Sequence, residues 1–138
     1  MLRNYDPGEL RTKHKWKKPN AGFVSDGHME IGKCPETMDL KLAEKLLNGG
    51  IVYPKENDIQ PQRIYNVYLG VVYRAEPTQP GVSFHGFPEK EIKGRRVPPT
   101  VLFQLAKKAQ ADGTFQLFKT WMKDHLPQGW KIVAPKFR

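Results

Sequence analysis

The segment RIYNVYLGVVYRAEPT, residues 63–78, decides the fold that the sequence predicts. Valine, isoleucine and tyrosine dominate both of its halves, and β-branched and aromatic residues favour strands. Leu69 and Gly70 stand between the halves, where a tight two-residue turn would reverse the chain. The segment is therefore predicted to form an antiparallel hairpin in which Tyr65 lies opposite Arg74.

A third strand is predicted in the segment GVSFHGF, residues 81–87, because Pro77 and Pro80 end the strand before it. Side chains alternate between the two faces of a strand, so Ser83 and His85 share one face. Both faces carry aromatic residues, and the pattern leaves open whether Ser83 and His85 face solvent or the core.

One helix is predicted before this sheet, at residues 39–48. Thr37 or Asp39 can cap its start, and two glycines follow its end. The residues expected on its apolar face are Leu40, Ala43, Leu46 and Leu47.

A helical hairpin is predicted after the sheet, at residues 99–126. Two prolines introduce its first helix, and a turn near Gly113 separates it from a second helix that Thr114 can cap. Pro127 is expected to end the second helix. The last residues, KIVAPKFR, are predicted to form a terminal strand or a basic tail.

These elements predict an α+β fold: a small antiparallel sheet with core strands at about residues 64–87, one helix before it and a helical hairpin after it. Residues 21–138 are expected to form one such domain, and residues 1–20 a flexible basic arm. The single cysteine, Cys34, excludes an intrachain disulfide and a zinc site built from several cysteines of one chain. No apolar run is long enough to span a membrane. We therefore expect a cytoplasmic protein with no cofactor, metal or membrane association, and the oligomeric state stays open.

Positive charge is concentrated at the two ends of the chain. The net charge is +9, and residues 1–20 carry six basic and two acidic residues. Residues 21–85 carry six basic and eight acidic residues, and residues 86–138 carry eleven and four. Such asymmetry predicts a polyanionic partner, because lysine and arginine that neutralise phosphates release counterions. Nucleic acid is the expected partner, with RNA favoured over DNA.

Two basic segments are candidate nucleic-acid contacts. The first is the loop KEIKGRR, whose adjacent arginines could clamp phosphate oxygens; its candidate residues are Lys90, Lys93, Arg95 and Arg96. The second is the arm, where an aromatic ring could stack on a base; its candidate residues are Lys15, Trp16, Lys17 and Lys18. The alternatives are a charged loop without a ligand and a solvated tail whose tryptophan packs on the domain.

Four residues of the predicted sheet could support metal-independent cleavage of RNA: Arg74, Glu76, Ser83 and His85. That reaction needs a group that removes a proton from the 2′-hydroxyl, a second group that protonates the leaving oxygen, and cations near the phosphorane. A helix with an antiparallel sheet that carries these residue types is similar to small ribonucleases in architecture, without a shared motif. Ribonuclease activity is thus a hypothesis added to that of RNA binding.

The alternative function is a protein-interaction module or inhibitor that binds an acidic partner through the basic helices and loop. Protein interfaces are rich in tryptophan, tyrosine and arginine. An exposed aromatic patch at Tyr68, Trp121 or Trp130 would favour this alternative.

Overall fold

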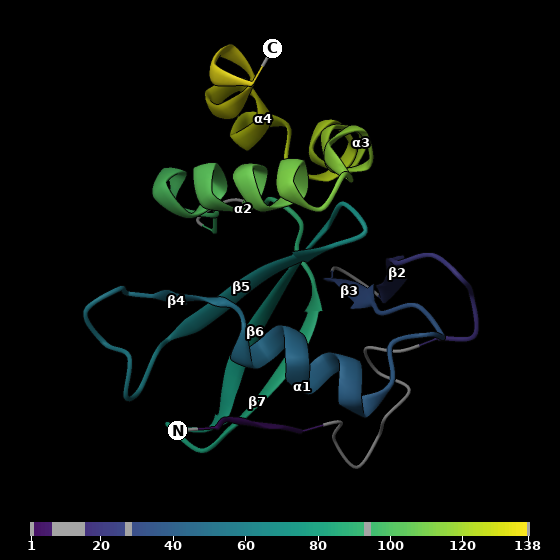
Figure 1. Cartoon of the computed structure of the whole chain (residues 1–138). Coiled ribbons are helices and arrows are strands. Elements are labelled where there is room, and N and C mark those ends of the chain that lie inside the picture. The colour runs from purple at the N-terminus through teal and green to yellow at the C-terminus, as the bar shows by residue number, and fades with distance from the viewer. Residues whose placement is uncertain (1, 7–15, 27–28, 93–94, 138) are drawn as a thin grey trace. The chain divides into compact units, whose positions relative to one another are not determined.

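The computed structural model describes residues 2–6, 16–26, 29–92 and 95–137 (Figure 1). The chain divides into two compact units. The sheet unit comprises Met1–Asn66 and Tyr73–Pro88, and the helical unit comprises Val67–Val72 and Glu89–Arg138. The α+β class is confirmed, whereas the expectation of one domain over residues 21–138 remains a prediction.

Within the described residues, seven strands form two sheets. Their bounds are β1 (Asn4–Tyr5), β2 (Gly22–Asp26), β3 (Met29–Lys33), β4 (Ile51–Tyr53), β5 (Arg63–Tyr68), β6 (Val71–Gln79) and β7 (Ser83–Pro88). The larger sheet has the order β1-β7-β6-β5-β4, and β2 and β3 form a separate two-stranded sheet. The pairs β2–β3, β4–β5 and β6–β7 are antiparallel.

The hairpin predicted from residues 63–78 is confirmed. β5 and β6 are neighbours in the sheet, and the two residues between them both have positive φ angles, 49° at Leu69 and 80° at Gly70. Positive φ at both central residues is the conformation of a type I′ turn, whose twist suits adjacent antiparallel strands. A glycine is required here, because a Cβ on Gly70 would lie 2.5 Å from the backbone of Leu117.

The sheet also includes residues that the sequence assigned to the arm. β1 pairs with β7 in parallel, so the sheet is mixed where the prediction was antiparallel. The amide groups of Asn4 and Asp6 donate to the carbonyl oxygens of Val82 and Phe84. Backbone pairing of this kind requires no apolar pattern, which explains why the sequence did not reveal it.

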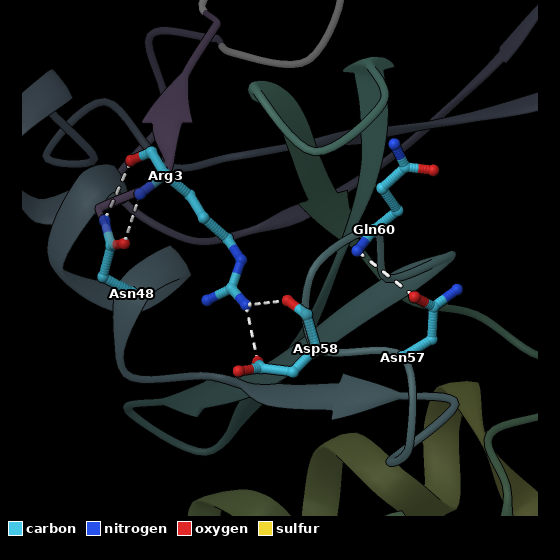
Figure 2. A network of polar contacts seen from close by, with 5 residues as sticks. All are labelled: Arg3, Asn48, Asn57, Asp58 and Gln60. Atoms are coloured by element: carbon cyan, nitrogen blue, oxygen red, sulfur yellow. Dashed lines mark hydrogen bonds and ion pairs between the residues drawn. The ribbon is translucent and has the colours of Figure 1, made fainter.

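A polar network fixes the start of β1 to two other parts of the sheet unit (Figure 2). The backbone of Arg3 exchanges two hydrogen bonds with the side-chain amide of Asn48, at 2.7 and 3.0 Å. The guanidinium of Arg3 donates to the carboxylate and to the backbone carbonyl of Asp58, at 2.8 and 2.9 Å. Arg3 thus contributes one of the arm's positive charges to an internal ion pair.

The predicted first helix is α1 (Leu40–Asn48), and Figure 1 shows it lying across one face of the larger sheet. The Asp39 carboxylate caps it by accepting a 2.8 Å hydrogen bond from the Leu42 amide. Leu47 packs in the core against Ile64 of β5 and neighbouring residues of the sheet. The assignment of Leu40 to the apolar face was wrong, because its side chain is 51% exposed.

The helical unit contains α2 (Pro99–Ala111), α3 (Phe115–His125), α4 (Pro127–Val133) and the 3₁₀ helix η1 (Ala134–Lys136). The predicted helical hairpin is confirmed as α2 and α3, with Gly113 at φ 74° between them. Thr114 does not cap α3 with its side chain, because its hydroxyl donates to the carbonyl oxygen of Ala109.

The chain end differs from the strand or tail that the sequence predicted. The second helix of the hairpin, α3, ends at His125, before Pro127 as predicted. Pro127 then occupies the first turn of a further helix, α4, where its fixed φ is favourable. The Glu91 carboxylate accepts hydrogen bonds from the amides of Gln128 and Gly129, at 2.8 and 2.9 Å. A residue distant in sequence therefore caps α4, which local sequence patterns do not report.

Candidate functional site

The predicted catalytic residues share one face of the sheet. Ile64, Ala75 and Phe84 pack beneath α1, so alternation directs their sequence neighbours to the opposite face. The register of β6 and β7 pairs Arg74 with Phe87 and Glu76 with His85. We refer to the surface that carries Arg63, Arg74, Glu76, Ser83 and His85 as the polar face.

Glu76 and His85 form the centre of the polar face. Residues directly opposite in an antiparallel pair have Cβ atoms roughly 5 Å apart. The carboxylate and the imidazole therefore project side by side from adjacent strands. Both side chains are partly exposed, so a ligand on this face could reach them.

Arg74 is buried, with only 2% of its surface exposed, although it lies on the polar face. Its Nη2 atom lies 3.1 Å from Oε1 of Glu76, and its guanidinium carbon lies 4.9 Å from the ring centre of Phe87. The Glu76 side chain is 39% exposed. The Arg74 guanidinium therefore contacts the Glu76 carboxylate from a buried position, and the catalytic role expected of Arg74 remains a prediction.

A hydroxyl group orients the imidazole. Nδ1 of His85 lies 2.9 Å from Oγ1 of Thr78, and the His85 ring centre lies 6.2 Å from that of Phe87. Ser83 is half-buried two residues before His85, on the same face. This answers the question that the sequence left open: both residues lie on the face opposite α1 and are partly accessible.

Arg63 is a further residue of the polar face that the sequence analysis did not select. A two-residue turn joins β5 and β6, so residues equidistant from it face each other, and Arg63 falls opposite Glu76. Its guanidinium lies 4.8 Å from the ring centre of Tyr53 and donates a 2.9 Å hydrogen bond to the hydroxyl of Tyr65. Counting six residues outward from the predicted turn would have found it.

The basic loop belongs to the helical unit and is partly occupied by internal contacts. Arg95 lies 3.5 Å from the carboxylate of Glu89, which is only 1% exposed. Lys90 is half-buried, and Arg96 is exposed. Lys93 lies outside the described residues. Of the described candidates in this loop, Arg96 is the most accessible cation.

Trp16 of the arm packs on the sheet unit. This agrees with the alternative of a tail whose tryptophan packs on the domain. A Cβ on Gly22 would lie 2.8 Å from the Trp16 ring, which shows how closely the indole approaches that glycine. The indole nitrogen donates to the carbonyl of Asn20, and Nζ of Lys18 lies 4.6 Å from the ring centre. Lys17 and Lys18 are exposed, whereas Lys15 lies outside the described residues.

A small cavity of about 40 Å³ lies in the core of the sheet unit. Its lining includes Tyr5, Cys34 and Asn66 among mainly apolar neighbours. The volume suits one or two water molecules and is too small for a substrate. Burial, with a smaller effect of Cys34, raises the pKa of Tyr5 to about 12.

Neither a metal cluster nor a membrane span is found in the described chain. Among residues 2–6, 16–26, 29–92 and 95–137, no three His, Cys, Asp or Glu side chains are grouped as metal ligands. No helix in the same ranges is both long and apolar enough to cross a membrane.

Comparison of the chain with protein-family models, with curated proteins and with solved structures found no match. The geometry of the polar face and the charge of the chain are therefore the features that bear on function.

Proposed function

We propose that the protein binds RNA and cleaves it without a metal ion at the polar face. The observation that carries this proposal is the direct cross-strand pairing of Glu76 with His85, with Arg63 beside them. A carboxylate and an imidazole at adjacent positions supply a general base and a general acid. The net charge of +9 favours a polyanionic substrate.

The reaction is an in-line transfer within the RNA strand. Glu76 removes the proton of a 2′-hydroxyl, whose oxygen attacks the adjacent phosphorus atom. The bond from phosphorus to the 5′-oxygen breaks, and His85 in its protonated form donates a proton to that oxygen. The products are a 2′,3′-cyclic phosphate and a 5′-hydroxyl, so atoms and protons balance without a cofactor.

The neighbouring residues have supporting roles. Arg74 orients the carboxylate of Glu76 through their ion pair and is therefore a positioning residue. Thr78 accepts the Nδ1 proton of the imidazolium, which directs the Nε2 proton toward the leaving oxygen. Arg63 is half-buried and can approach a phosphate, where its charge would stabilise the phosphorane.

The test uses the full chain and a short mixed-sequence RNA with a fluorophore and a quencher, in EDTA. We expect cleavage by the wild type and no cleavage of the same RNA when every 2′-hydroxyl is replaced by hydrogen. His85→Gln and Glu76→Gln should each lower the rate by a factor of about 10² or more, because each removes one proton-transfer group. The matched control is Glu56→Gln, an exposed loop glutamate outside the polar face.

Binding is measured separately, as the anisotropy of an uncleavable labelled RNA at several salt concentrations. We expect salt-sensitive binding in the wild type and in His85→Gln alike, since binding depends mainly on the basic residues. Equal cleavage rates in all variants would disprove the assignment of the site. Absence of both binding and cleavage at low salt would disprove the proposed function.

A further inference from the structure

The helical unit carries a cluster of half-buried aromatic rings drawn from four segments. Phe103 comes from α2, Phe115 from α3 and Trp130 from α4, and Phe137 follows η1. The ring centre of Phe137 lies 6.3 Å from that of Phe103 and 5.8 Å from that of Phe115. The ring centres of Phe115 and Trp130 lie 6.2 Å apart. We call this set the aromatic surface.

Lysine side chains cover the aromatic surface. Nζ of Lys136 lies 5.1 Å from the ring centre of Phe103, and Nζ of Lys119 lies 6.0 Å from that of Trp130. Lys107 is exposed and follows Phe103 by four residues, which places both on the same side of α2. The surface thus combines apolar rings with at least three ammonium groups.

Two acidic residues of this unit lie on helix sides opposite members of the aromatic surface. Asp112 follows Phe103 by nine residues, and Asp124 follows Phe115 by the same number. Nine residues make two and a half helical turns, so each aspartate lies on the opposite side of the helix from its phenylalanine. Glu89 is buried, and the Glu91 carboxylate caps α4. These four are the only acidic residues between positions 89 and 138. Among the described residues of this unit, the charged groups found over these rings are the ammonium groups of Lys119 and Lys136.

We propose that the aromatic surface docks an acidic segment of a partner protein that also carries apolar side chains. The charge selects an anion, and half-buried aromatic residues are the anchors that protein interfaces use most. Single-stranded RNA fits less well. Base stacking needs accessible ring faces, whereas Lys119 lies over Trp130 and Lys136 over Phe103. Phe137 contacts the rings of Phe103 and Phe115. This inference is independent of RNA cleavage at the polar face.

Of the three aromatic residues named as possible anchors, Trp130 belongs to this surface. Trp121 is 9% exposed and packs in the core of the helical unit. Tyr68 is half-buried at the end of β5 and has no described ring contact with the cluster. Trp130 is therefore the residue whose environment should report binding.

The experiment uses the full chain and a fluorescein-labelled short peptide of Asp, Glu, Leu and Phe. We expect salt-sensitive binding measured by anisotropy, and a shift of the Trp130 indole signal in a ¹H–¹⁵N correlation spectrum while the Trp16 signal stays in place. The double variant Lys119→Gln/Lys136→Gln should weaken binding about fivefold or more. The charge-matched control is Lys41→Gln/Lys45→Gln on the exposed face of α1.

Three outcomes would overturn the proposal. The first is absence of peptide binding at low salt. The second is an equal loss of peptide affinity in the two double variants, which would show that binding depends on net charge and not on the aromatic surface. The third is a shift of the Trp130 signal by oligouridylate and not by the peptide, which would assign the aromatic surface to nucleic acid. The cleavage assay with Glu76 and His85 variants is unaffected by any of these results.

Discussion

Replacing Tyr5 with phenylalanine should destabilise the sheet unit by removing one hydroxyl group. That hydroxyl donates to the carbonyl oxygen of Gly86 at 3.2 Å and accepts from the Gly86 amide at 3.3 Å. In the described part of the chain, β1 pairs with β7 at Ser83 and Phe84, and the Tyr5 hydroxyl binds the backbone of Gly86 further along β7. With two hydrogen bonds lost at a buried backbone unit, we expect about 2 kcal/mol lower free energy of unfolding near pH 7.

The same variant should alter the dependence of stability on pH. The pKa of Tyr5 is raised from 10.0 to about 12 in the folded protein, so the folded state holds the proton more tightly than the unfolded state. This contribution to stability is complete below about pH 10 and is lost as the pH rises toward 12. The linkage gives a loss of about 1.4 kcal/mol by pH 11. Tyr5→Phe has no such loss, so the difference in unfolding free energy between wild type and variant should shrink to about 0.6 kcal/mol at about pH 11.

Urea unfolding followed by circular dichroism measures both effects, with wild type and Tyr5→Phe compared at each pH. Titration of lysines and of the other tyrosines is common to both proteins and cancels in the difference. A deficit that stays constant from pH 7 to pH 11 would refute the argument that Tyr5 is held protonated by burial. A negligible deficit at both pH values would refute its hydrogen-bonding role at Gly86.

Two further substitutions test the helical unit. Gly70→Ala should lower the free energy of unfolding by about 2–4 kcal/mol, because alanine disfavours a φ of 80° and its Cβ would lie 2.5 Å from the backbone of Leu117. Thermal unfolding of the variant that matches the wild type would contradict this expectation. Glu91→Gln should lower the free energy of unfolding by about 1 kcal/mol, because a neutral amide replaces the carboxylate that binds the amides of Gln128 and Gly129. Hydrogen exchange of the α4 amides should become faster in this variant, and slower exchange would contradict the expectation.

The sequence predicted those parts of the fold that depend on local patterns. β-branched and aromatic residues around Leu69 and Gly70 gave the central hairpin, and apolar residues at helical spacing gave α1, α2 and α3. Alternation in β7 correctly placed Ser83 and His85 on one face. Each of these features is encoded within a few residues, where propensity and periodicity act.

The features that the sequence missed depend on contacts between distant residues. β1 has only two residues and joins β7 through backbone groups, which leave no pattern in the sequence. α4 is capped by Glu91, nearly forty residues before it. Arg63 reaches the polar face only because the hairpin register brings β5 beside β6. Residue types alone could therefore suggest a chemistry for this face, but they could not identify all of its residues.

The position of Arg74 bears on the function proposed for the polar face. Burying a cation is costly, and apolar residues of similar volume often stabilise a fold as well as a buried ion pair does. Arg74 is nevertheless 2% exposed, while the carboxylate that it contacts, on Glu76, is 39% exposed. An ion pair with one partly exposed partner contributes little to stability, because solvent screens the attraction. A buried cation behind a partly exposed carboxylate restrains the orientation of that carboxylate at the surface, beside His85, and the proposed role of Glu76 as a general base depends on such an orientation.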